Sequence, residues 1–121
     1  MAIVATDILF KFSVKTGSAG DTVAGTAAGS LGKYISTTQI TDATLNNLFD
    51  DVSGDENLAS DVEYRCIFVH NNHATLTWQS PVVWLSAETA GGANAAIALD
   101  GLGVTPKGQA AAQADEVANE N

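Results

Sequence analysis

Short runs in which apolar and polar residues alternate recur along this chain, and turn-forming residues separate them. In the first run, residues 8–14, every second residue is apolar: Ile8, Phe10, Phe12 and Val14. A period of two is the spacing of a β-strand that buries one face. Because such runs follow one another at intervals of about 8–12 residues, the sequence predicts an all-β fold, an antiparallel β-sandwich.

Five further segments have strand-like patterns: residues 34–38, 62–71, 75–78, 82–87 and 95–99. Residues 62–71 carry the strongest signal, and since both faces of their later half are apolar, we expect this strand at the centre. Asn71, Asn72 and His73 predict a tight turn into residues 75–78, because Asn tolerates positive φ. The predicted core consists of side chains that alternate in step along the strands: Phe10, Phe12, Tyr64, Cys66, Phe68, Val82, Trp84, Ile97 and Leu99.

The segments between the strands differ in character. Residues 17–32 contain five glycines and no apolar period, which predicts a long flexible loop or arm that orders against a partner. Asp42 is expected to cap one short helix, whose apolar face has the spacing i, i+3, i+4, i+7: Leu45, Leu48, Phe49 and Val52. Residues 50–61 are interpreted as an exposed acidic connection. Residues 101–121 are expected to form a loosely attached tail, in which 110–120 could be a helix or an edge strand.

The length of 121 residues predicts a single domain, residues 1–121, large enough for a core without disulfides. Fourteen acidic residues against five basic ones give a net charge of −9, which disfavours nucleic acid and anionic membranes as partners. No apolar run approaches the roughly 18 residues of a membrane span, and the first residues do not resemble a signal peptide. We therefore expect a protein made in a cytoplasm.

Two sequence patterns come close to ligand-binding motifs and fail on spacing. Residues 27–34 approximate a phosphate-binding loop, but Ala27 stands in place of its first Gly and Tyr34 in place of its Ser or Thr. Residues 51–62 are rich in oxygen ligands, but Val62 stands where a calcium loop needs a bidentate Glu. We interpret these segments as a loop and as a solvated acidic connection.

The remaining candidates for chemistry also have simple structural explanations. His70 and His73 would share a metal only if the turn brought them together, and Cys66 alternates with aromatic residues as a buried side chain does. Trp78 and Trp84 lie in predicted strands and are interpreted as packing residues, with a sugar platform as the other possibility. The sequence thus provides no catalytic set, metal site or cofactor site, which favours an interaction protein over an enzyme.

Five stretches of the chain resemble small structural proteins of tailed-phage virions: residues 31–38, 48–52, 63–71, 73–77 and 82–87. The resemblance covers about residues 31–100 and follows the strand pattern. It implies an immunoglobulin-like sandwich and a place on the virion, with capsid decoration or cement proteins as members of the group. It transfers no functional residue, because the group has no chemical motif to match.

These considerations predict a decoration protein that binds the outer face of the major capsid protein lattice. An acidic chain outside the shell avoids the packed phosphates of the genome, which favours the capsid exterior. A homo-oligomer at a local symmetry axis is expected, a trimer in preference to a dimer. Two alternatives stay open: a tail- or baseplate-associated sandwich that contacts a host surface, and a carbohydrate-binding module.

Overall fold

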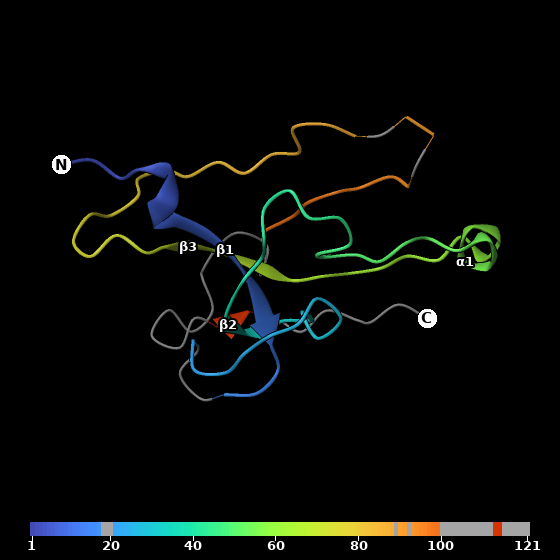
Figure 1. Cartoon of the computed structure of the whole chain (residues 1–121), viewed down its shortest axis with the longest axis horizontal. Helices are drawn as coiled ribbons and strands as arrows, with labels where there is room; N and C mark the ends of the chain where they lie inside the picture. Colours follow the sequence, from blue (N-terminus) through green and yellow to red (C-terminus); the bar gives the residue numbers. More distant parts are fainter. Residues whose placement is uncertain (18–20, 89, 92, 100–112, 115–121) are drawn as a thin grey trace.

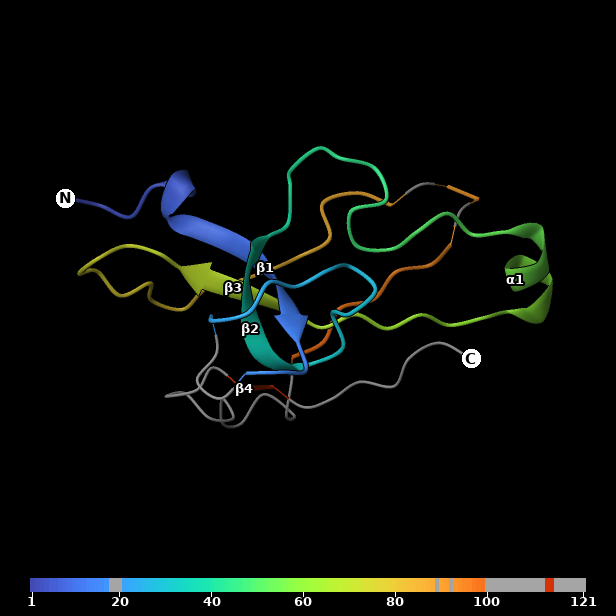
Figure 2. The same ribbon diagram turned by 60° about the horizontal axis from the view of Figure 1, so that its bottom comes forward.

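The computed structural model describes residues 1–17, 21–88, 90, 91, 93–99, 113 and 114, and it contains one antiparallel sheet. Three strands form the body of this sheet: β1 (Ile8–Val14), β2 (Lys33–Gln39) and β3 (Ile67–Asn71). The two-residue strand β4 (Gln113–Ala114) adds to the outer side of β2, which gives the order β3-β1-β2-β4 (Figures 1 and 2). The 3-10 turn η1 (Ala5–Asp7) precedes β1, and α1 (Gly54–Ala59) lies away from the sheet.

Strand β1 is the centre of the sheet and has the bounds that the alternating sequence predicts. It pairs with β2 on one side and with β3 on the other, both antiparallel. Lys11, Phe12 and Ser13 are consecutive and all buried, so both faces of β1 are covered here. The prediction that residues 62–71 are central is wrong, because β3 pairs only with β1 within the described residues.

Ser30 explains why β3 begins at residue 67 and not at residue 62. The β1–β3 ladder ends at the pair Phe12 and Ile67, so Ser13 and Cys66 would form the next pair. Ser30 lies between them: its Oγ accepts the Ser13 N–H at 2.9 Å, and its carbonyl accepts the Cys66 N–H at 2.7 Å. The Ser30 Oγ also donates to the Cys66 carbonyl at 2.6 Å. Ser30 thus replaces the direct backbone bonds between Ser13 and Cys66, and β3 begins after Cys66.

The loop that follows β1 folds back onto the sheet over residues 21–32. The Lys11 Nζ lies 2.9 Å from the Asp21 carboxylate, and the Leu31 side chain is buried. The sequence shows no apolar period in this loop, but hydrogen bonds, the Lys11–Asp21 ion pair and the buried Leu31 hold residues 21–32 on the sheet. The predicted mobility of residues 17–32 stays a prediction, and residues 18–20 lie outside the described residues.

This loop contacts β2 at a bulge. Lys11 is opposite Gln39 and Ser13 is opposite Ile35, so β2 carries two more residues than β1 between these pairs. The Ser36 Oγ accepts the Thr38 N–H at 3.2 Å within the bulge. The loop reaches the same place, because Thr37 N–H donates to the Val23 carbonyl at 2.9 Å.

The predicted helix at Asp42 is wrong, and α1 begins twelve residues later, at Gly54. Ala43 and Asn46 have φ values of 53° and 56°, which a continuous right-handed helix does not allow. Ser53 caps α1 instead: its Oγ accepts the Glu56 N–H at 3.2 Å, and the Glu56 carboxylate accepts the Ser53 N–H at 2.6 Å. This reciprocal pair is a capping box, so the predicted acidic connection contains the helix.

The described residues after β3 form no further long strand, and the described chain shows no second sheet. The segments 75–78, 82–87 and 95–99, which the sequence predicts to be strands, form no strand, and β3 covers only the second half of residues 62–71. Among the predicted core side chains only Phe12 is fully buried, and Cys66 and Phe68 are half-buried. The others are exposed: Phe10, Tyr64, Val82, Trp84, Ile97 and Leu99.

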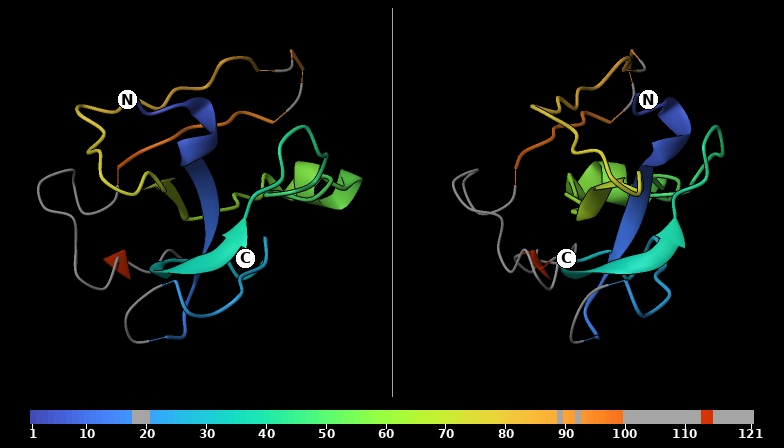
Figure 3. Two further views of the ribbon diagram at one scale, coloured as in Figure 1. Left: turned by 60° about the vertical axis from the view of Figure 1, so that its left-hand side comes forward. Right: turned by 90° about the vertical axis from the view of Figure 1, so that its left-hand side faces the viewer.

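The unpaired C-terminal segments form an open loop beside the sheet. Figure 3 shows residues 93–99 running back below residues 77–88. Among the described residues three hydrophobic side chains are buried, namely Phe12, Leu31 and Ile35. The small core lies where the 21–32 loop covers β1 and β2. Apart from β4, the predicted tail 101–121 lies outside the described residues.

Candidate functional site

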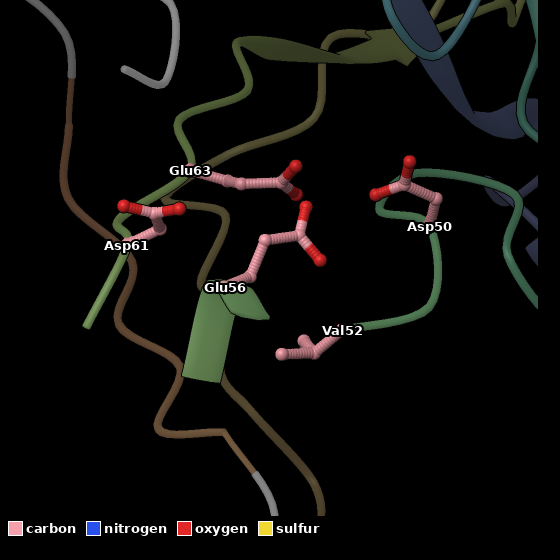
Figure 4. A pocket seen from close by; sticks show the side chains of 5 residues that line it. All are labelled: Asp50, Val52, Glu56, Asp61 and Glu63. Carbon is pink, nitrogen blue, oxygen red and sulfur yellow. The ribbon is translucent and has the colours of Figure 1, made fainter. Parts of the chain in front are cut away.

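Carboxylates gather around a small cavity beside α1. The cavity has a volume of about 30 Å³ and is lined by Asp50, Val52, Glu56, Asp61 and Glu63. Figure 4 shows the carboxylates of Asp50, Glu56 and Glu63 pointing into a common space, while Asp61 lies beside the Glu63 chain. The cavity has room for about one water molecule, so it is too small for an organic ligand.

Local hydrogen bonds account for the orientation of the central carboxylate of this cavity. The Ser53 side chain and backbone, both bonded within the capping box, lower the pKa of Glu56, and this keeps the carboxylate charged at neutral pH. Among the described residues, no group of three or more His, Cys, Asp or Glu side chains is arranged to hold a metal ion. Residues 50–61, which the sequence predicts to be a solvated acidic connection, therefore include a helix-capping carboxylate, that of Glu56.

Arg65 forms one wall of the acidic region. Its guanidinium lies 3.7 Å from the Glu63 carboxylate, donates to the Tyr64 carbonyl at 2.9 Å, and is centred 5.3 Å from the Phe49 ring. One Arg side chain that stacks on an aromatic ring and also pairs with a carboxylate can hold two chain segments together where no hydrophobic core joins them. This arrangement ties residues 49 and 63 together near α1.

The two histidines do not form a metal site. His70 lies on β3 in register with Leu9, and its buried Nδ1 has no hydrogen-bond partner. Burial, and then the charge of Lys11, lower the pKa of His70, which keeps the ring neutral at pH 7. The His73 Nδ1 accepts the backbone N–H groups of Thr75 and Leu76 at 3.2 and 3.0 Å. His73 therefore stabilises the predicted turn after β3.

The buried serines are structural and not nucleophilic. Ser13 and Ser30 are completely buried and their hydroxyl oxygens lie 3.3 Å apart. The Ser13 Oγ accepts the Gly32 N–H at 2.8 Å, so both hydroxyls are engaged with the backbone. Cys66 next to them is half-buried and bonds through its backbone to Ser30. The failed phosphate-loop motif at 27–34 thus supplies a polar core contact.

A second depression lies at the opposite end of the sheet, between η1 and the end of β2. It has a volume of about 380 Å³ and is lined by Ala5, Thr6, Ile8, Leu9, Gln39 and Asp42. Its lining combines apolar side chains with three polar ones, Thr6, Gln39 and Asp42. None of the ligand-binding motifs considered in the sequence lies in this depression.

Large apolar side chains are exposed on two segments, residues 82–87 and 95–99, which together we call the apolar surface. Every residue in these two segments is exposed, and Trp84 and Leu99 are 71% and 81% exposed. The sequence from residue 66 to residue 99 contains one charged residue, Glu88, although the whole chain carries a net charge of −9. Depletion of charge around exposed large side chains is typical of the centre of a protein–protein interface.

In comparisons with known proteins, the chain matches no family model, no curated protein and no solved structure. No helix within the described part of the chain is both long and apolar enough to cross a membrane. The geometry of the described residues therefore carries the functional argument.

Proposed function

We propose that this protein is a structural component of a tailed-phage virion, a decoration or cement protein that binds the outer face of the major capsid protein lattice. One observation carries the proposal together with the sequence resemblance. The large apolar side chains that should form a core remain exposed in the single chain, as Trp84 and Val82 illustrate. A chain of this kind completes its packing by association, which suits a protein that acts in an assembled shell.

The charge distribution supports the exterior of the shell. The net charge of −9 would be repelled by packed genome phosphates, whereas the capsid exterior presents protein and solvent. Screening over about 8–10 Å restricts this effect to close contacts. The protein has no catalytic role in this proposal, since its contribution is the stability that a bound ligand confers on the assembled state.

In the bound state we expect the immunoglobulin-like sandwich that the resemblance implies. The sheet β3-β1-β2 would be one layer, and the unpaired segments 75–78, 82–87 and 95–99 would supply the strands of the other. Their alternating side chains fit a surface that is buried on one face. A homo-oligomer at a symmetry axis, with a trimer preferred, would then present several copies to the lattice.

The test compares heads assembled with and without this protein. Heads that carry the protein should survive heating to a higher temperature and osmotic shock by a larger dilution. Reconstruction of the particle should show added density on the outer shell. A Trp84→Lys variant should bind the shell more weakly, because it places a charge in the apolar surface. Ser86→Ala changes an exposed residue of the same segment and serves as the matched control. Equal survival without outer density would reject the decoration role.

The exposure of Trp84 also supports a second candidate, a carbohydrate-binding module. An exposed indole face is the platform on which sugar rings stack. In that case added glycans should protect the fluorescence of Trp84 from a soluble quencher, and Trp84→Ala should abolish the protection while Trp78→Phe retains it. No protection by host-surface glycans would exclude this candidate.

A further inference from the structure

We infer that the depression between η1 and the end of β2 binds a primary ammonium group together with the alkyl chain that carries it. A free alkylamine and the side chain of a Lys residue on a partner protein both present this chemistry. The inference goes beyond the proposed virion role and does not depend on it.

The size of the depression is the first observation. Its volume of about 380 Å³ lies within the range of small-molecule sites, about 300–1,000 Å³. The cavity beside α1 has a volume of about 30 Å³, which is room for about one water molecule. Of these two hollows, the depression is therefore the one that can take an organic group.

The apolar part of the lining is the second observation. Ile8 and Leu9, at the start of β1, are half-buried, and Ala5 of η1 adds a third apolar side chain. Alkyl carbons gain free energy when they leave water for such a surface, whereas a metal ion does not. Among the described residues no group of three or more His, Cys, Asp or Glu side chains is arranged to hold a metal ion. The lining thus favours an organic ligand.

The polar part of the lining fixes the charge of that ligand. Asp42 contributes a carboxylate, which makes no ion pair with any described residue, and no Lys or Arg lines the depression. A carboxylate attracts a cation and repels an anion. The ligand is therefore expected to be an organic cation.

The number of acceptor groups favours a primary amine among organic cations. The Asp42 carboxylate, the Gln39 amide oxygen and the Thr6 hydroxyl are three side-chain groups that can accept a hydrogen bond. A primary ammonium group has three donors and no acceptor, so it can use all three of these groups.

Backbone hydrogen bonds hold both sides of the depression in place. The Ile40 N–H donates to the Phe10 carbonyl at 2.7 Å, which keeps the end of β2 beside β1. In η1, the Asp7 carboxylate accepts the Val4 N–H at 2.9 Å, and the Asp7 N–H donates to the Val4 carbonyl at 2.9 Å. A ligand that meets a preformed site spends less free energy on ordering the protein.

The affinity should nevertheless be modest and sensitive to salt. Thr6, Gln39 and Asp42 are all exposed, so water competes for the same groups. An ion pair between exposed groups changes an equilibrium constant by up to about fivefold. Added salt should weaken the binding further, because it screens exposed charges.

The test is a titration of the full chain with n-butylammonium chloride, followed by the NMR shifts of backbone amides at constant pH and ionic strength. Sodium butyrate has the same number of carbon atoms and the opposite charge, and it serves as the control ligand. Asp42→Asn removes the charge and nearly retains the shape. Asp51→Asn makes the same change at an exposed residue outside the depression and is the matched control.

We expect n-butylammonium, but not butyrate, to cause saturable shifts of the amides of Thr6, Leu9 and Gln39. Asp42→Asn should weaken the binding by about two- to fivefold, whereas Asp51→Asn should retain the wild-type affinity. Shifts that do not saturate, equal shifts with butyrate, or equal affinities of the two variants would overturn the inference. If Asp42→Asn alters the fold, the comparison of the two ligands on the wild-type chain decides.

A second titration, with Nα-acetyl-lysine N-methylamide, distinguishes the two sources of the amine. If this compound shifts the same amides as n-butylammonium, the site accepts the Lys side chain of a partner protein. If n-butylammonium alone binds, the ligand is a free alkylamine. If neither compound binds, the inference is wrong, and the proposed virion role is unaffected because shell binding is measured separately.

Discussion

Replacing Ser30 by Ala should lower the free energy of unfolding more than any other single-atom change to a polar side chain in the described core. Ser30 is completely buried, and its Oγ accepts the Ser13 N–H at 2.9 Å. Ser13 is also completely buried, so water cannot replace the lost partner. The substitution removes one oxygen atom and leaves that backbone donor without an acceptor.

The expected loss follows from the cost of an unpaired buried donor, about 1–3 kcal/mol. With a urea m-value of about 1.5 kcal/mol/M, a loss of about 2 kcal/mol lowers the midpoint by about 1.3 M. The m-value itself should stay unchanged, because the exposed area on unfolding is nearly the same.

The assay is urea denaturation followed by circular dichroism at one fixed protein concentration, so that self-association does not alter the comparison. Ser86→Ala is the matched control, since it removes the same atom at an exposed position and should change the stability by less than about 0.5 kcal/mol. If Ser30→Ala and Ser86→Ala have the same midpoint, Ser30 does not hold β1 and β3 together and the explanation for the start of β3 is wrong.

Three further predictions concern the loop, the pH dependence and the thiol. Gly25→Ala should cost about 1–3 kcal/mol, because a Cβ there would lie 2.8 Å from Ser36, whereas Gly54→Ala, with nothing within 4 Å, should be neutral or stabilising in the same urea experiment. The folded-state pKa of His70 is lowered, so its contribution to stability is present above the ordinary pKa of 6.5 and is lost as the pH falls through the folded-state pKa. The melting temperature of His70→Gln should therefore depend less on pH below pH 6.5 than that of the wild-type protein. Cys66, half-buried, should react with a thiol reagent more slowly in buffer than in urea, and equal rates would contradict its packing.

The sequence predicts the β1–β2 half of the sheet well, because two local signals agree there. Alternation alone gives the bounds of β1, and the β-branched residues around Ile35 give β2. The start of β3 could not be predicted, since it depends on Ser30, a residue 36 positions away from Cys66 along the chain. Long-range side-chain bonds of this kind leave no periodic trace in the sequence.

The helix and the predicted core residues show two further limits of prediction from the sequence. The apolar spacing at 45–52 predicts a helix, but nothing packs on Leu45, which is 90% exposed, and the capping box at Ser53 and Glu56 starts the helix later. That Ser-x-x-Glu signature is visible in the sequence and could have placed α1. The predicted core residues after β3 are the larger error, because alternation predicts a strand but does not say which strand pairs with it.

The most direct test of the proposed virion role is quantitative mass spectrometry of heads and tails separated from the source particle. The account predicts that this chain is found in the head fraction, at a fixed ratio to the major capsid protein set by a symmetry axis of the lattice, and is absent from purified tails. Its presence in tails alone, or its absence from both fractions, would contradict the account.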